Sequence, residues 1–230
     1  MNSAYCVDFA DTKVDPQVRG FLHTPEVPNG RGLVLTHGAG GNAQAPLLRA
    51  LADTFAQAGY AVLRCNLPFR QTRSFGPPGP ADGARDRAGL KNAVAVLTSV
   101  MNVGQAEKEK GRIFLGGHSY GGRQSSMLCA EEPALVSGLL LLSYPLHPPR
   151  RPEQQRTQHL PDLRTPTLFV HGTRDPFGTI EELQRARKMI PAKNALFTVE
   201  GAGHDLGFKG KGTNRALPGA ILENFQTLVE

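Results

Sequence analysis

The chain has 230 residues, of which 40% are hydrophobic and 20% are charged, and this balance excludes an intrinsically disordered protein. The formal net charge is +6, but the lysines and arginines are scattered without a run of five like charges, so we expect no nucleic-acid-binding surface. The length is compatible with one domain and a sizeable core, and we expect a single domain over residues 1–230.

The cysteines and the apolar segments indicate the cellular compartment. Cys6, Cys65 and Cys129 are widely spaced, and an odd number without a C-x-x-C pair argues against a disulfide framework or a zinc site. Reduced thiols suit a cytoplasmic protein, and the first residues do not resemble a signal peptide. The longest apolar segment, 138–142, is too short to span a bilayer. We therefore expect a cytoplasmic protein that binds neither membrane nor metal.

Strand-like and helix-like segments alternate along the chain. Strands are expected at 18–23, as an early edge strand, and then at 32–36, 60–65, 112–115, 136–143, 167–170 and 196–199. Helices are expected at 46–58, 88–103, 122–130, 179–189 and 216–229. Continuous apolar strands that alternate with amphipathic helices predict an α/β fold, with a mostly parallel sheet covered by helices on both faces.

Two segments are predicted to be irregular. The Pro- and Gly-rich composition of 75–80 is typical of an exposed loop. The segment 145–161 is Pro-rich and basic, and it follows a predicted strand where some α/β enzymes carry a lid. This segment has room for a turn or a short helix but not for a cap domain, so we expect a minimal lid.

The most informative motif is Gly117-His118-Ser119-Tyr120-Gly121, which follows an apolar strand and leads into a helix. A G-x-S-x-G sequence in this setting is typical of a nucleophile elbow, with the serine at the apex of a sharp turn. The glycines are needed because side chains two residues to either side of the apex collide across the turn. The less favoured alternative for this segment alone is a glycine-rich turn that carries a bystander serine.

Three further loops at predicted strand ends supply complementary chemistry, because functional groups collect at the carboxyl ends of parallel strands. The loop 171–177 carries Asp175, and the loop 200–205 carries His204. The order Ser119, Asp175, His204 is that of an α/β-hydrolase catalytic triad. In this interpretation the imidazole removes the serine proton, and the carboxylate orients the imidazole.

The third loop, 37–41, offers backbone N–H groups that no large side chain obstructs. The tetrahedral intermediate of acyl transfer needs such donors, and we assign them to the N–H groups of Ala39 and Tyr120. Gly38, Gly40 and Arg70 are further candidates for contacts with a substrate.

Each of these residues has a purely structural alternative. In this alternative, Asp175, which precedes a proline, only forms a turn, and His204 is only a loop residue. Asp205 is a competing acid, but it should point away from the histidine that it follows, and Asp162 is a weaker competitor. The remaining histidines near strand ends are expected to be structural: the side chain of His118 turns into the core, and His37 and His171 brace loops through backbone hydrogen bonds. The conjunction of four loops in the right order favours the catalytic interpretation.

The strings GHSYGGRQ at 117–124, SYPLHPP at 143–149 and GTRDPFGT at 172–179 carry a family resemblance. With the segments 32–42 and 201–206, they resemble the alpha/beta-hydrolase superfamily, and more narrowly a KANL3/Tex30-like group of small hydrolases related to dienelactone hydrolase. The resemblance covers nearly the whole chain and implies an eight-stranded sheet, a serine nucleophile and no cofactor. It implies no particular substrate.

Two functional hypotheses follow. The first is a serine hydrolase that acts on a small acyl ester, thioester or related compound, as a monomer or a homodimer. Arginines in loops expected at the rim, Arg70, Arg73, Arg150 and Arg151, then either favour an anionic substrate or are ordinary solvated side chains. The second hypothesis is a non-catalytic interaction module that keeps the hydrolase fold, because a fold does not determine a function.

Overall fold

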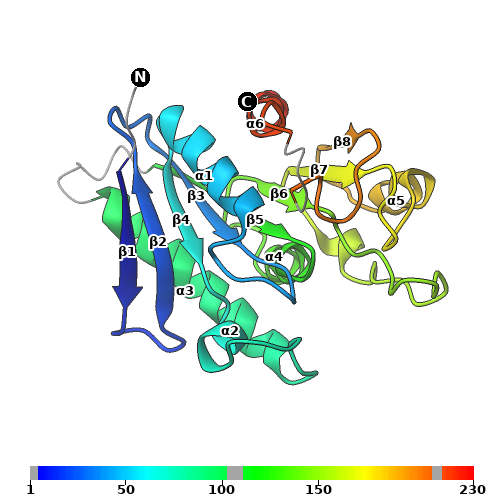
Figure 1. Cartoon of the computed structure of the whole chain (residues 1–230), viewed down its shortest axis with the longest axis horizontal. Coiled ribbons are helices and arrows are strands. Elements are labelled where there is room, and N and C mark those ends of the chain that lie inside the picture. Colours follow the sequence, from blue (N-terminus) through cyan, green and yellow to red (C-terminus); the bar gives the residue numbers. More distant parts are fainter. Residues whose placement is uncertain (1–4, 103–110, 209–213) are drawn as a thin grey trace.

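The computed structural model describes residues 5–102, 111–208 and 214–230, and it contains one eight-stranded sheet. The strands are β1 (Tyr5–Asp11), β2 (Val18–Thr24), β3 (Arg31–Thr36), β4 (Ala61–Cys65), β5 (Arg112–His118), β6 (Leu139–Leu142), β7 (Thr167–Gly172) and β8 (Asn194–Val199). Their spatial order is β1-β2-β4-β3-β5-β6-β7-β8 (Figure 1). The first two strands are antiparallel to their neighbours, and the pairs from β4 to β8 are parallel. The predicted, mostly parallel sheet is confirmed.

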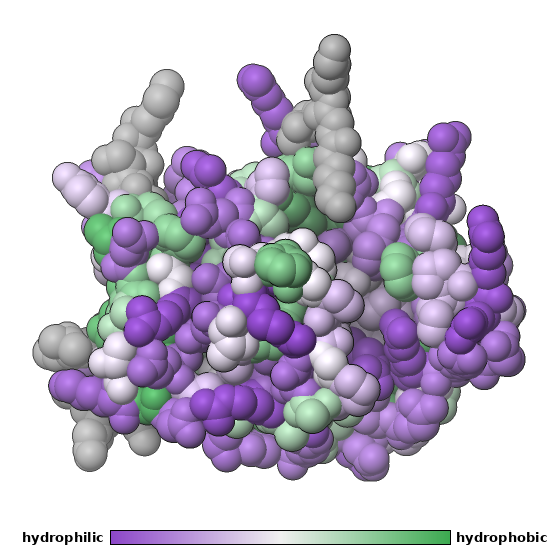
Figure 2. Space-filling model, turned by 60° about the horizontal axis from the view of Figure 1, so that its bottom comes forward, coloured by the Kyte–Doolittle hydropathy of each residue, from purple (hydrophilic) through white to green (hydrophobic). Residues whose placement is uncertain are grey.

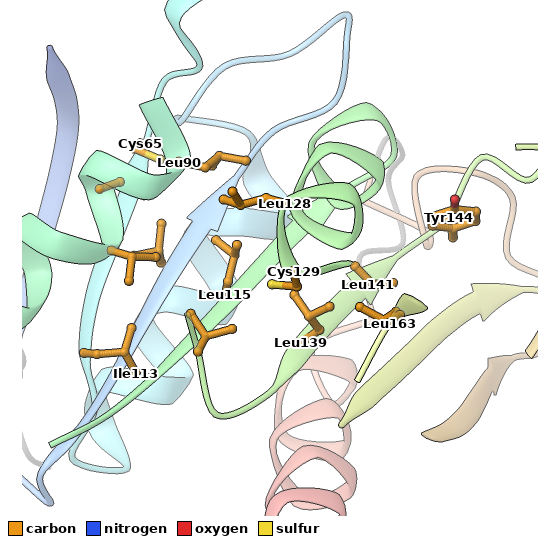
Figure 3. Packing of buried hydrophobic residues seen from close by; sticks show 14 of the residues in the cluster. Cys65, Leu90, Ile113, Leu115, Leu128, Cys129, Leu139, Leu141, Tyr144 and Leu163 are labelled. Carbon is orange, nitrogen blue, oxygen red and sulfur yellow. The ribbon is translucent and has the colours of Figure 1, made fainter. Parts of the chain in front are cut away.

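The helices lie on both faces of this sheet, as predicted (Figure 1). They are α1 (Pro46–Gln57), α2 (Pro68–Thr72), α3 (Asp82–Asn102), α4 (Tyr120–Glu131), α5 (Ile180–Arg187) and α6 (Leu217–Val229). Apolar residues of α1 and α6 pack on one face, and those of α3, α4 and α5 pack on the other. Figure 3 shows part of the second cluster, in which Leu90 of α3 and Leu128 of α4 lie over Leu115 of β5.

The central strand β6 explains why its sequence is a continuous leucine run. Leu139 and Leu141 pack into the cluster under α4, whereas Leu140 and Leu142 pack into the cluster under α1 and α6. All four side chains are fully buried. Because successive side chains of a strand point to opposite faces, a strand that is covered on both faces must be apolar at every position.

Three expectations about the elements are corrected. The segment 18–23 was expected at the edge of the sheet, but β1 pairs outside β2 and is itself the edge. β1 was missed because most of its residues are exposed and acidic residues interrupt its apolar ones. The helix expected to begin at residue 88 begins at Asp82, and its expected last residue, Val103, lies outside the described residues. The helix α2 lies between the strand expected at 60–65 and the loop expected at 75–80, where no helix was expected.

The irregular segment after β6 remains irregular, as predicted. Within 145–161 the structure has only the beginning of a short 3-10 turn, Leu160–Asp162. The segment is tied to the core through Tyr144, whose hydroxyl donates a hydrogen bond to the carbonyl oxygen of Arg156 at 2.7 Å. This part of the chain therefore forms no cap domain. Only a minimal lid follows the carboxyl end of β6.

The cysteines behave as small core residues at two of three positions. Cys65 and Cys129 are buried, and burial raises the pKa of each thiol to about 12. Cys6 is exposed, and all three thiols are free. None of the helices within the described ranges is both long enough and apolar enough to cross a membrane.

Candidate active site

Ser119 lies at the apex of a sharp turn between β5 and α4. Its backbone has φ 51° and ψ −117°, a conformation that is costly for a residue with a side chain. A Cβ atom on Gly117 would lie 2.5 Å from the backbone nitrogen of Gly122, and one on Gly121 would lie 2.5 Å from the carbonyl oxygen of His37. Glycine is therefore required on both sides of the serine. At Gly117 the collision is across the turn, as expected from the sequence, whereas at Gly121 it is with the end of β3 and the residue that follows it.

The structure brings together Ser119, His204 and Asp175 from the carboxyl ends of β5, β8 and β7. His204 follows β8, and its Nε2 atom lies 2.8 Å from the Oγ atom of Ser119. Its Nδ1 atom lies 2.8 and 3.0 Å from the two carboxylate oxygens of Asp175, which follows β7. The serine and histidine are 85 residues apart in sequence, so only the parallel sheet makes this contact possible.

The environment of Asp175 keeps it ionised. Burial raises the pKa of this carboxyl, but the hydrogen bond from His204, the nearby imidazoles and the N–H of Phe177 outweigh burial and hold the pKa below its ordinary value. An ionised Asp175 accepts the Nδ1–H of His204, which leaves Nε2 to accept the hydroxyl proton of Ser119. The site thus selects the tautomer that a general base needs.

The ring of His204 is held from two further sides. The ring of Phe177 lies against it with centroids 4.2 Å apart. The Nε2 atom of His118 is 2.7 Å from the carbonyl oxygen of His204, and the two imidazole rings are 5.1 Å apart. This corrects the expectation for His118, whose side chain does not turn into the core but holds the histidine loop.

The competing acids are placed elsewhere. The Oδ1 atom of Asp205 accepts a hydrogen bond from the N–H of Gly207 at 3.1 Å, so this carboxylate supports its own loop. Asp162 is exposed on the short 3-10 turn after the irregular segment. Asp175 is the carboxylate that contacts His204.

A cavity of about 270 Å³ opens above Ser119. The loop 37–41 forms one wall, and Pro46, Leu47 and Leu48 at the start of α1 extend it. Phe177, Phe208, His204 and Asp205 also line it. The wall is largely apolar, and no residue of 145–161 takes part in it, so the minimal lid leaves this opening uncovered.

His37 braces the loop 37–41, as expected. Its Nδ1 atom donates to the carbonyl oxygen of Gly38 at 2.8 Å, and its Nε2 atom accepts from the N–H of Leu67 at 3.1 Å. The N–H of Gly41 donates back to the same carbonyl of Gly38 at 3.1 Å, which closes the loop into a turn. His171 likewise donates from Nε2 to the carbonyl oxygen of Gly178 at 2.9 Å. Both histidines hold backbone rather than a ligand.

The amides expected to bind an oxyanion belong to Tyr120, which follows Ser119 in the chain, and to Ala39, which lines the same cavity as Ser119. Tyr120 is the first residue of α4, and the first N–H groups of a helix have no partner within the helix. Ala39 and its neighbours Gly38 and Gly40 line the cavity. The hydroxyl of Tyr120 donates to Asp86 at 2.7 Å, away from the cavity, so the residue offers its backbone to the site.

Arg70 does not lie where the sequence analysis expected a substrate contact. It is 8% exposed, it is not among the residues around the cavity, and its guanidinium donates to backbone carbonyl oxygens. Arg73 pairs with Asp82, and Arg150 and Arg151 are exposed. The described wall of the cavity contains a carboxylate, Asp205, but no lysine or arginine. The idea of an arginine-lined rim for an anionic substrate therefore finds no counterpart in the described structure.

Two residues that help to form this region, Asp86 and Phe208, were not indicated by the sequence. Asp86 lies in a polar stretch typical of a solvated helix, yet it is fully buried between α2 and α4. Phe208 is one apolar residue in a loop, and nothing local indicates that it reaches the cavity. Within the described residues no group of three or more His, Cys, Asp or Glu side chains is arranged to hold a metal ion.

Comparisons with known proteins agree with this architecture. A dienelactone hydrolase from Anabaena variabilis is 22% identical, with a TM-score of 0.71 over 100% of this chain and 99% of that one. An alpha/beta serine hydrolase homologue from Coxiella burnetii is 18% identical, with a TM-score of 0.67 over 97% and 95% of the two chains. A serine hydrolase without a lid from Xanthomonas campestris is 14% identical, with a TM-score of 0.69 over 98% and 94%. At these identities the likeness establishes the fold.

The family itself follows from the sequence. The family model for the alpha/beta hydrolase domain matches residues 29–220, which include all four loops around Ser119 and most of the sheet. The resemblance noted from the motifs is thus confirmed, and the chain belongs to the alpha/beta hydrolase family.

Proposed function

We propose that this protein is a serine hydrolase that cleaves the ester or thioester bond of a small acyl compound through an acyl-enzyme. One observation carries the proposal: an unbroken chain of hydrogen bonds runs from Ser119 Oγ through His204 to Asp175, at 2.8 Å for each closest contact. This series of hydrogen bonds ends at Ser119, which lines a cavity, so the nucleophile is accessible to a ligand. These are the geometric requirements of nucleophilic acyl transfer.

The first half of the reaction forms the acyl-enzyme. As Ser119 Oγ attacks the acyl carbon, its proton passes to Nε2 of His204, and the negative charge of Asp175 stabilises the imidazolium. The carbonyl oxygen becomes an oxyanion, which the N–H groups of Ala39 and Tyr120 bind. When the intermediate collapses, Nε2 returns the proton to the leaving alkoxide or thiolate.

The second half repeats these steps with water. A water molecule gives its proton to His204 Nε2 and attacks the acyl carbon of the ester on Ser119. The same two amides bind the second oxyanion, and the proton then returns to Ser119 Oγ as the carboxylic acid leaves. Ser119, His204 and Ala39 line the cavity, and Asp175 contacts His204 from behind this wall, which supports this sequence of steps.

The cavity supports a small, uncharged acyl group as the substrate class. Ligand cavities commonly measure about 300–1,000 Å³, so about 270 Å³ is at the small end of this range. Leucine, proline and phenylalanine side chains form much of the wall, and the only acidic or basic side chains among the described wall residues are Asp205 and the histidines.

The three free thiols support a reducing, cytoplasmic location.

The decisive experiment is labelling with a fluorophosphonate probe, which reacts only with an activated serine. We expect the wild-type protein to be labelled at Ser119 and Ser119→Ala to be unlabelled, with kcat on a p-nitrophenyl ester lowered by about 10⁶-fold, as for triad serines in general. Mass spectrometry locates the label, and hydrolysis of an ester series of increasing chain length measures turnover.

Ser126→Ala is a matched control. Ser126 lies about two turns further along α4, and its hydroxyl donates to the carbonyl of Arg123 and contacts His159, outside the cavity. This variant should keep both the label and the activity. Absence of labelling in the wild-type protein, or equal labelling of Ser119→Ala, contradicts the proposed function and favours a non-catalytic module.

A further inference from the structure

Arg70, in the last turn of α2, is a nearly buried cation whose hydrogen bonds to described residues all end on backbone carbonyl oxygens. Its Nη2 atom donates to Ala39 at 2.7 Å, and its Nε atom donates to Gly41 at 2.9 Å. The same guanidinium donates to Gly76 at 2.8 Å and to Arg73 at 3.1 Å. A planar guanidinium has five donors in a fixed arrangement, so it holds these two loops in one relative position.

These bonds determine how the peptides of the loop 37–41 are turned. In a planar trans peptide the C=O of one residue and the N–H of the next point in opposite directions. Arg70 lies outside the cavity and holds the carbonyl of Ala39, so the N–H of Gly40 is directed away from Arg70. The carbonyl of Gly38 accepts hydrogen bonds from Gly41 and His37, so the N–H of Ala39 is directed away from these two donors. The loop is thus fixed with its carbonyl oxygens occupied.

Among the described contacts, the peptide between Ala39 and Gly40 has little other means to hold this orientation. Three of its five residues are glycines, and a Cβ atom on Gly40 would meet nothing within 4 Å, so its neighbourhood is open. Without the guanidinium, the peptide between Ala39 and Gly40 is free to rotate and to present its carbonyl oxygen to the cavity. A carbonyl dipole turned this way repels the oxyanion that the N–H groups stabilise.

The position of Arg70 is itself linked to the other amide donor. Asp86, fully buried, accepts the N–H of Phe69 at 3.1 Å through Oδ1 and the hydroxyl of Tyr120 at 2.7 Å through Oδ2. The rings of Phe69 and Tyr120 also pack edge to face, with centroids 5.8 Å apart. The short helix that carries Arg70 is therefore fixed against the first residue of α4, whose N–H is the second donor.

We propose that Arg70 is a positioning residue for the oxyanion site: by holding the carbonyls of Ala39 and Gly41 outside the cavity, it keeps these carbonyl oxygens away from the oxyanion and fixes the loop that carries the N–H of Ala39. The proposal rests on the proposed serine hydrolase function and assigns Arg70 no contact with the substrate. It gives Arg70 an effect on the transition state, where the oxyanion exists, and little effect on the ground state.

Steady-state kinetics of Arg70→Ala and Arg70→Lys test this assignment. Removing one oxyanion donor costs about 10²–10³ in kcat, so a mispositioned loop should lower kcat by roughly 10²-fold, with KM changed by less than about 3-fold. Arg70→Lys should recover part of kcat, because one ammonium retains the charge but not the planar set of donors. Arg73→Ala is the matched control, because its side chain pairs with Asp82 and not with the loop 37–41; it should behave as wild type.

Inhibition by an alkyl trifluoromethyl ketone separates positioning from loss of folded protein. The ketone forms a hemiketal with Ser119 whose oxygen occupies the oxyanion site, so its Ki should rise in parallel with the fall in kcat. Thermal unfolding and titration with the fluorophosphonate probe give the fraction of native sites in each variant. If Arg70→Ala does not fold, Arg70→Lys provides the same comparison.

The outcomes distinguish this proposal from the function on which it rests. If wild-type protein is not labelled by the probe, the hydrolase function fails. If wild type is labelled but kcat per titrated site and the ketone Ki are unchanged in Arg70→Ala and Arg70→Lys, the positioning role is overturned and the hydrolase function stands. A rise in KM at constant kcat equally overturns it, because that result assigns Arg70 to substrate binding.

Discussion

Histidines with the same intrinsic chemistry are placed around Ser119 for two purposes. His204 has one ring nitrogen on a carboxylate and the other on a hydroxyl, so it is able to pass a proton between them. His37, His118 and His171 have ring nitrogens at backbone carbonyl oxygens, and they hold the loops on which the reacting groups lie. Burial and the partner of each ring decide which purpose it serves, and neither can be read from the residue type.

His37 leads to a prediction about stability and pH. Burial lowers the pKa of His37 to about 4, from 6.5 for an exposed imidazole. Because the folded-state pKa is below the unfolded one, the unfolded chain binds the proton first, and the stability present above pH 6.5 is lost as the pH falls toward 4. His37→Gln should therefore lose stability less steeply than wild type, by about 1.4 kcal/mol per pH unit in this range.

Urea unfolding of both proteins at pH 7, 6 and 5 measures this difference. His23 and His159 have pKa values lowered in the same sense and titrate in both proteins, so their contribution cancels in the comparison. Equal slopes for wild type and His37→Gln would mean that His37 binds a proton as readily in the folded protein as in the unfolded chain.

At the scale of elements, the elbow depends on how closely α4 approaches the end of β3. Gly121 lies against the carbonyl of His37, and a Cβ atom there would also come within 2.6 Å of the Thr36 side chain. The same contact thus sets the distance between the nucleophile and the loop that carries the proposed amide donors. A strand-to-helix turn at this distance has room only for glycine.

Gly121→Ala should therefore reduce both stability and activity. Overpacking typically costs about 1–3 kcal/mol, and here the colliding atoms are backbone, which has little freedom to move. Displacement of the loop 37–41 should lower kcat as well. Chemical unfolding and ester hydrolysis measure the two effects.

Gly203→Ala is the matched control for this substitution. Gly203 immediately precedes His204, but a Cβ atom there would meet no atom within 4 Å. We expect a change in stability within about 0.5 kcal/mol and activity close to wild type. If both variants behave alike, close approach is not what requires glycine at the elbow.

At the scale of the whole molecule, the sheet separates two apolar clusters and gathers the site at one edge. Figure 2 shows the side of the molecule near α2, where hydrophilic residues predominate and hydrophobic ones lie in small separate groups. The irregular segment 145–161 packs beside α4 and does not contribute to the described wall of the cavity. The surface arginines and the interior of the cavity are therefore separate features, and the net charge of +6 does not describe the site.

This separation predicts the charge preference of the proposed hydrolase activity. A carboxylate on the acyl chain would lie in an apolar cavity beside Asp205, without a described cation to pair with it. We expect p-nitrophenyl butyrate to exceed the p-nitrophenyl monoester of succinate in kcat/KM by at least about 10-fold, which corresponds to about 1.4 kcal/mol. Asp205→Asn should reduce this preference.

The double variant Arg150→Ala/Arg151→Ala is the control, because both side chains are exposed on the segment outside the cavity. Its ratio of kcat/KM for the two esters should equal that of wild type. If wild type prefers the succinate ester and this variant does not, the hypothesis that surface arginines bind an anionic substrate is supported.

Local chemistry predicted much of this protein because its constraints act within a few residues. Apolar runs such as 139–142 indicated buried strands, and Gly117 and Gly121 indicated a turn too tight for side chains. The alternation of strands and helices indicated a parallel sheet, and its strand ends nominated Ser119, Asp175 and His204. The triad proposal therefore required no structure, although the distances that support it did.

Other features depend on contacts between distant segments and had no local signal. β1 belongs to the sheet only because β2 offers it a partner, and Asp86 is buried only because α2 and α4 meet over it. The sequence left Arg70 as a candidate substrate contact or a solvated arginine, and only the fold brought the carbonyls of two loops to its guanidinium. Local sequence specifies which conformations and chemical groups are available, whereas burial and partners are decided when the chain closes on itself, because hydrogen bonds and desolvation depend on neighbours in space.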